Sequence, residues 1–125
     1  MALVLDTGAL IAIDRAQRPV GALLRVAQRE RLPVRTSAAV VAQVWRGGPR
    51  QANLARTLAG VGVVAMDHTA GRRIGELLAR SGGSDVVDAH VALLATPADT
   101  VLSSDVGDMR RLLATRKVHA TVHQV

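Results

Sequence analysis

Five short segments, apolar over most of their length, predict strands. They are Ala2–Leu5, Val34–Arg35, Val61–Ala65, Thr100–Ser103 and Ala120–Val122. Val61–Ala65 is apolar throughout, and Ala2–Leu5 runs directly into Asp6-Thr7-Gly8, which indicates a strand that ends in a turn. The aliphatic character of these segments favours a sheet buried under helices.

The segments between the strands carry helical signals. In Val20–Arg31, for example, Leu23, Leu24 and Ala27 recur on one face. Thr36-Ser37 predicts an N-cap, and Gly47-Gly48-Pro49 predicts a helix end. The predicted helices are Ala9–Ile13, Val20–Arg31, Ala38 to about Arg46, Gln51–Leu58, a helix capped by Asp67 or Thr69 that runs to about Arg80, Val86–Ala95 and Asp108–Thr115.

Alternating strands and helices predict an α/β fold. We expect a three-layer α/β/α arrangement, in which helices flank a central parallel sheet of four or five strands. The length of 125 residues fits a single domain that spans residues 1–125.

Composition narrows the class of protein. A hydrophobic content of 49% excludes a disordered chain, and the lack of cysteine excludes disulfides, zinc–thiolate sites and thiol catalysis. Trp45 is the only aromatic residue; we interpret it as filling the core or a helix seam rather than stacking on a base or anchoring a partner. Without a basic leader or a membrane-length apolar stretch, we expect a cytoplasmic protein that does not associate with membranes.

The formal net charge of +6 makes a polyanionic partner plausible, since nearly all the cations are arginine, whose planar fork suits phosphate. A GC-rich genome would also favour arginine. Several cations are candidates for a basic rim around a site, although solvated helix faces would have the same sequence. These are Arg72, Arg73, Arg110, Arg111, Arg116 and Lys117.

Three aspartates are expected at one edge of the sheet. Asp6 and Asp105 each follow a predicted strand, and Asp88 lies in the first turn of a predicted helix. Functional groups of open α/β sheets gather beyond the carboxyl ends of the strands. Three carboxylates without a basic partner repel one another unless a hard divalent cation such as Mg²⁺ or Mn²⁺ binds. Such a cation can activate water and offset charge on phosphate, which predicts phosphodiester hydrolysis.

Each acid also has a simpler interpretation. Asp6, Asp88 and Asp105 could serve only as helix caps or dipole partners, as we expect for Asp85. Asp108 is either a further acid of the site or a cap. Asp14, Asp67 and Asp99 are interpreted as surface or turn residues, and His90 as a helix-surface or packing residue.

Four segments, in this order and spacing, resemble the PIN-domain family, in particular VapC-type toxins of bacterial toxin–antitoxin pairs. They are Val4–Leu10, Thr36–Arg46, Asp88–Leu94 and Val101–Met109. The resemblance covers essentially the whole chain. It implies a PIN-like fold and RNA cleavage that depends on Mg²⁺ or Mn²⁺. It also implies a VapB-type antitoxin as partner and a homodimer, for which apolar helix faces such as Leu23 and Leu24 are available.

The same resemblance suggests roles for individual residues. Asp6, Asp88 and Asp105 match three of the four usual acidic positions and would hold the metal. Thr7 and Ser103 or Ser104 would support the site. Apart from the resemblance, the sequence itself makes Asp108 a candidate supporting residue. Arg46, Arg110 and Arg111 are candidates for RNA binding.

Gln43 departs from the family, which usually has Glu at this fourth acidic position. Glutamine can ligate a cation but brings no charge and cannot act as a base. Three explanations stay open: an active natural variant, a weakened enzyme or an engineered knockout. The alternative function is a catalytically inactive module that binds RNA or antitoxin. A phosphoacceptor receiver domain is disfavoured, because it needs a strand-end lysine and the only lysine is Lys117.

Overall fold

A computed structural model describes all residues from 1 to 125 and contains one five-stranded parallel sheet. The strands lie in the order β3-β2-β1-β4-β5, and every neighbouring pair is parallel. Their bounds are β1 Leu3–Leu5, β2 Val34–Ser37, β3 Gly62–Val64, β4 Thr100–Ser103 and β5 Thr121–Gln124. The expected α/β fold with a parallel central sheet is therefore confirmed.

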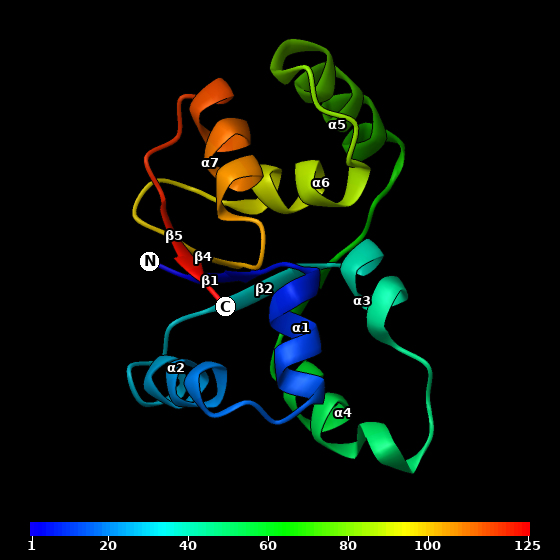
Figure 1. The fold of residues 1–125 in the computed structure, drawn as a ribbon, viewed down its shortest axis with the longest axis vertical. Coiled ribbons are helices and arrows are strands. Elements are labelled where there is room, and N and C mark those ends of the chain that lie inside the picture. Colours follow the sequence, from blue (N-terminus) through cyan, green and yellow to red (C-terminus); the bar gives the residue numbers. More distant parts are fainter.

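Helices cover both faces of this sheet (Figure 1). One face carries α5 (His68–Ser81), α6 (Val86–Leu94) and α7 (Val106–Thr115). The other carries α1 (Thr7–Asp14), α2 (Arg18–Arg29) and α4 (Ala52–Leu58), and α3 (Ala38–Val44) lies beside α1. A single 3₁₀ turn, Pro49–Gln51, leads into α4. None of the helices is long and apolar enough to cross a membrane.

The chain order places a topological switch point between β1 and β4. From β1 the chain proceeds outward to β2 and β3, and it then returns to the other side of β1 to form β4 and β5. Open α/β sheets bind ligands in the crevice outside the carboxyl ends of the strands at such a point. Asp6 and Ser104-Asp105 follow these two strands, so the topology brings both segments to this position.

The core is almost entirely aliphatic. Leu5, Leu10, Leu54, Leu77 and Leu102 are among its largest fully buried side chains, and Met109 is buried with them. Trp45 does not contribute: it is 41% exposed, so the expectation that it fills the core or a helix seam is wrong. We attribute this to its position at the C-terminal cap of α3, where the chain turns outward.

Asp99 is a second correction: it closes a turn that begins at Thr96, but it is not a surface residue, since it is 1% exposed. Its carboxylate accepts hydrogen bonds from the backbone N–H of Ala2 (2.8 Å) and from the backbone and hydroxyl of Thr96 (2.8 Å each). It also pairs with Arg35 at 3.2 Å. Asp99 therefore joins the amino ends of β1 and β4 to β2, at the edge opposite to Asp6.

Candidate metal centre

Three of the helices, α1, α6 and α7, begin near the acids of interest, and an aspartate caps each of them. The N–H of Ala9 donates to Asp6 Oδ1 (2.9 Å) at α1, and that of Asp88 to Asp85 Oδ1 (2.9 Å) at α6. The N–H of Asp108 donates to Asp105 Oδ1 (3.1 Å) at α7. The capping roles considered from the sequence are therefore present. Each cap uses one carboxylate oxygen, and the second oxygen of Asp85 and of Asp105 accepts no hydrogen bond from the chain.

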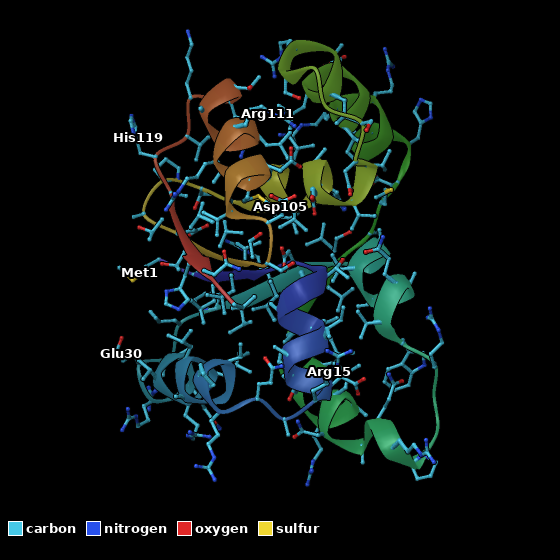
Figure 2. All side chains as sticks on the ribbon, in the orientation of Figure 1. Met1, Arg15, Glu30, Asp105, Arg111 and His119 are labelled. Carbon is cyan, nitrogen blue, oxygen red and sulfur yellow. The ribbon has the colours of Figure 1, made fainter.

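Three of the acids near these helix starts converge. Asp88, Asp105 and Asp108 each offer a carboxylate oxygen, and these three oxygens lie within 4.8 Å of one another. Asp105 lies at the start of α7, where this helix meets the sheet (Figure 2). Asp88 comes from α6, and Asp108 comes from the first turn of α7. The carboxylates are thus supplied by two separate segments of the chain.

The electrostatic environment of Asp88 reflects this crowding. Partial burial is the main cause that raises the pKa of Asp88, and the charges of Asp85, Asp6 and Asp108 raise it further, to about 7. In the absence of a counterion, the site therefore favours a proton on Asp88. A bound cation would replace that proton and remove the repulsion.

Asp6 is close enough to act on Asp88 through its charge, but it is not one of the three converging acids. It is only 2% exposed. Its Oδ1 accepts from Ala9, and its Oδ2 accepts from the backbone N–H of Ser104 (3.2 Å). Burial raises the pKa of Asp6, and hydrogen bonds from Ser103, Ala9 and Ser104 oppose this rise. Asp6 therefore joins the ends of β1 and β4 as well as adding charge.

The two serines after β4 organise the turn that presents Asp105. The backbone N–H of Asp105 donates to Ser103 Oγ (3.0 Å), and Ser103 is fully buried. Ser104 packs against Gly8 so closely that a Cβ on Gly8 would overlap the Ser104 side chain. The start of α1 thus has a fixed position relative to the start of α7.

Gln43 lies at the border of this site. Its side-chain oxygen accepts a hydrogen bond from the hydroxyl of Thr7, the residue after Asp6. The Gln43 side chain is exposed. The polar group at the fourth position is therefore linked to the acidic site through Thr7.

Two buried side chains connect the elements that carry Gln43 and Asp88. His90 Nδ1 lies 2.5 Å from Ser37 Oγ, and Ser37 is also the N-cap of α3. Both residues are buried, which confirms a packing role for His90. Burial lowers the pKa of His90, because it disfavours the charged imidazolium. The pair fixes α6 against the junction of β2 and α3.

The cations lie in different environments. Arg111 forms an ion pair with Asp108. Arg116 donates to the carbonyl oxygens of Ala92 (2.6 Å) and Ala95 (2.8 Å), so it caps the end of α6 and does not form part of a free basic rim. Arg46 and Arg110 are exposed and have no carboxylate partner.

The sequence left open whether Asp108 is an acid of the site or a cap, whereas the structure places it among the three converging carboxylates. Its spacing of three residues after Asp105 was the available signal, since one capped helical turn brings an N-cap side chain close to the N3 residue.

The donor set fits a hard divalent cation. Only carboxylate oxygens converge, no histidine or cysteine competes with them, and the single cation in contact is Arg111 on Asp108. Mg²⁺, Mn²⁺ and Ca²⁺ prefer such oxygen ligands, whereas zinc sites usually include nitrogen or sulfur.

The fold is similar to that of a chain in the crystal structure of VapBC2 from Rickettsia felis bound to a DNA fragment from their promoter. The TM-score is 0.72 over 99% of this chain and 100% of that chain, at 14% sequence identity. This identity is low enough that the likeness concerns the fold alone. No protein-family model matches the chain, and the search of curated protein sequences gives no match.

Proposed function

We propose that this chain is a metal-dependent endoribonuclease, the toxin of a toxin–antitoxin pair. The observation that carries the proposal is the convergence of Asp88, Asp105 and Asp108 at the switch point of the sheet, next to the buried Asp6. The family resemblance of the motifs and the fold of the VapBC2 chain support the same activity.

The side chains of the site have distinct tasks in this proposal. Asp88, Asp105 and Asp108 hold Mg²⁺, for which Mn²⁺ substitutes, and Asp6 adds negative charge and fixes the turn after β4. Ser103 orients Asp105 through its backbone. Thr7 orients the side chain of Gln43 at the border. The starts of α1 and α7 direct their positive dipole ends towards a phosphate at this edge.

The bound cation supplies activation of water and neutralisation of charge on the phosphodiester. The chain provides no nucleophilic side chain at the site, so hydrolysis needs no covalent intermediate. The products should carry 5′-phosphate and 3′-hydroxyl ends.

A VapB-type antitoxin is the proposed protein partner, because the fold neighbour comes from a VapBC structure. A homodimer is part of the same proposal. The partly buried Leu23 and Leu24 on α2 are apolar residues available for such contacts.

The test is cleavage of total RNA by purified, antitoxin-free protein with Mg²⁺ or Mn²⁺. Asp105→Asn removes one clustered carboxylate, and Glu76→Gln makes the same chemical change on the exposed face of α5. We expect cleavage by the parent and by Glu76→Gln, and none with Asp105→Asn or with a chelator. Cleavage that persists in Asp105→Asn would overturn the proposal.

Activity that appears only in Gln43→Glu would mean that the scaffold is intact but disabled. If neither the parent nor Gln43→Glu cleaves RNA, the result would instead favour the alternative, a module that binds RNA or antitoxin without cleaving RNA.

A further inference from the structure

Trp45 is exposed although it offers the largest apolar surface of any side chain in the molecule. The other large exposed hydrophobic residues are valines and Met1. Burial of an aromatic side chain is among the largest single contributions to a core, yet here the core is aliphatic and the indole is 41% exposed. Trp45 therefore contributes little to the core and is available to a ligand.

The backbone around Trp45 is held in one conformation. Gln51 is 7% exposed, and its Oε1 accepts from the N–H groups of Arg46 (2.7 Å) and Gly47 (3.0 Å). Its Nε2 donates to the carbonyl of Val44 (2.9 Å). One buried amide thus fixes the chain on both sides of Trp45.

The indole lies beside the turn at Gly47. Gly47 has a φ of +80°, and its Cβ position would lie 3.9 Å from the indole Nε1. A rigid aromatic side chain loses little conformational entropy when a ligand binds. We call the exposed indole on this fixed backbone the platform.

The segment that carries this platform is positively charged, although the carboxylate of Asp14 on α1 accepts a hydrogen bond from Gln51 Nε2 (3.4 Å). From Ala38 to Met66 the chain has three arginines, Arg46, Arg50 and Arg56, and no Asp or Glu. None of the three has a carboxylate within ion-pair distance. Arg46 Nη1 donates to the carbonyl oxygens of Ala42 (3.2 Å) and Trp45 (2.7 Å), which holds this guanidinium beside the platform. An aromatic surface flanked by arginines that have no carboxylate partner is complementary to a ligand that combines π-faces with phosphates.

The platform is also close to the acidic site. Gln43, two residues before Trp45, contacts Thr7, which follows Asp6. Two residues of extended chain span at most about 7 Å. In Figure 1, α3 lies beside α1, and the segment that follows α3 runs along the outer border of the molecule.

We infer that Trp45 stacks on a base of single-stranded RNA, beside the nucleotides whose phosphate reaches the carboxylates. The inference rests on the proposed function and specifies its substrate: an unpaired strand or loop, since the base faces of a duplex are covered. Arg46 and Arg50 would contact the flanking phosphates.

Intrinsic fluorescence tests this directly, because the chain has one Trp and no Tyr. The experiment uses the Asp105→Asn chain with Mg²⁺, so that RNA persists, and four probes: an unstructured RNA oligonucleotide, the same sequence as a duplex, polyphosphate and poly-glutamate. We expect saturable quenching by the single strand and much weaker quenching by the other three. Equal quenching by duplex or polyphosphate would overturn base stacking. A response to poly-glutamate alone would indicate an acidic protein partner instead.

Variants provide the second readout, the affinity for labelled single-stranded RNA measured by anisotropy in the Asp105→Asn background. Trp45→Phe should retain most of the affinity, whereas Trp45→Leu should weaken it about five- to hundredfold, the usual range for one stacked base. Val26→Ala, an exposed apolar residue of α2, is the control and should have no effect. Equal affinity of Trp45→Leu and Trp45→Phe would contradict the inference.

Failure here is distinguishable from failure of the proposed function. Metal-dependent cleavage of RNA together with an unchanged affinity of Trp45→Leu would overturn only the role of Trp45. Absence of both cleavage and RNA binding would overturn both.

Discussion

The hydroxyl of Thr7 donates a hydrogen bond to the side-chain oxygen of Gln43, and this contact links α3 to the first residue after Asp6. Both partners are neutral, so the link adds no charge to the site. A glutamate at position 43 would keep the acceptor for Thr7 and add a negative charge at the border of the acidic cluster.

Gln43→Glu should therefore bind Mn²⁺ more tightly. One additional nearby charge is worth about 1 kcal/mol in a partly solvated site, or roughly fivefold in affinity. Gln43→Ala removes the hydrogen bond with Thr7 without adding charge and serves as the control. Titration calorimetry measures the Mn²⁺ affinity of the parent, Gln43→Glu and Gln43→Ala. Equal tightening in Gln43→Ala would show that charge is not the cause.

The stability of the metal-free protein should depend on the ionisation of Asp88. Its folded-state pKa of about 7 lies above the ordinary value of 3.8, so protonation stabilises the folded state. This stabilisation is fully present below the unfolded pKa and is lost as the pH rises through about 7. Asp88→Asn cannot ionise; it should match the parent near pH 4 and be more stable than the parent at pH 8.

Urea unfolding with a chelator at several pH values measures this difference. Glu76→Gln, on the exposed face of α5, should follow the parent at every pH. Addition of Mn²⁺ at pH 8 should stabilise the parent and leave Asp88→Asn nearly unchanged. A difference between parent and Asp88→Asn that is the same at pH 4 and pH 8 would refute the raised pKa.

Gly8→Ala should disturb the site through Ser104. The new Cβ would overlap the Ser104 side chain, and overpacking of this kind costs about 1–3 kcal/mol. The displaced turn carries Asp105, so Mn²⁺ affinity should fall as well. In a Ser104→Gly background the overlap with the side chain is absent and only the 3.2 Å approach to the backbone nitrogen of residue 104 remains, so Gly8→Ala should destabilise much less there. Thermal unfolding of the parent, Gly8→Ala, Ser104→Gly and the double variant measures this coupling as a double-mutant cycle.

Asp99→Asn should destabilise the protein without affecting the metal site. The substitution leaves Arg35 without its partner and sets an amide donor among the N–H groups of Ala2 and Thr96, a loss of about 2–4 kcal/mol. Although burial acts to raise the pKa of Asp99, hydrogen bonds from Thr96 and Ala2 and the charge of Arg35 outweigh it and hold the pKa below its usual range. The loss is therefore fully present at neutral pH and shrinks in acid. Reduced Mn²⁺ affinity in folded Asp99→Asn would be unexpected, because Asp99 lies at the opposite edge of the sheet.

Local signals were sufficient to predict most of the fold. The apolar segments ending at Leu5 and Ser103 are strands, and Ser37, Asp67 and Asp85 cap helices as their positions suggested. The observed ends of some elements differ from the predicted ones where a contact between distant segments extends an element. Thr36 belongs to β2, because its hydroxyl donates to the carbonyl of Leu5 in the neighbouring strand.

The positions of polar side chains were less predictable, because they depend on partners far away in the sequence. Asp99 is buried by Ala2 and Arg35, which are 97 and 64 residues away. The backbone after the exposed Trp45 is held by the side chain of Gln51, at the end of the 3₁₀ turn Pro49–Gln51. The spacing of Asp105 and Asp108 is a local signal that these two acids lie close together, but the packing of α7 on α6, which brings both to Asp88, has no local signal.

The central claim is that Asp88, Asp105 and Asp108 form a divalent cation site, and a Mn²⁺ titration followed by electron paramagnetic resonance at pH 8 tests it most directly. The parent and Glu76→Gln should bind Mn²⁺ equally. Asp105→Asn and Asp108→Asn should each bind at least about tenfold more weakly, because each loses one charged oxygen ligand. If Asp105→Asn binds Mn²⁺ as tightly as Glu76→Gln does, the three carboxylates do not form the site and the proposed chemistry has no basis.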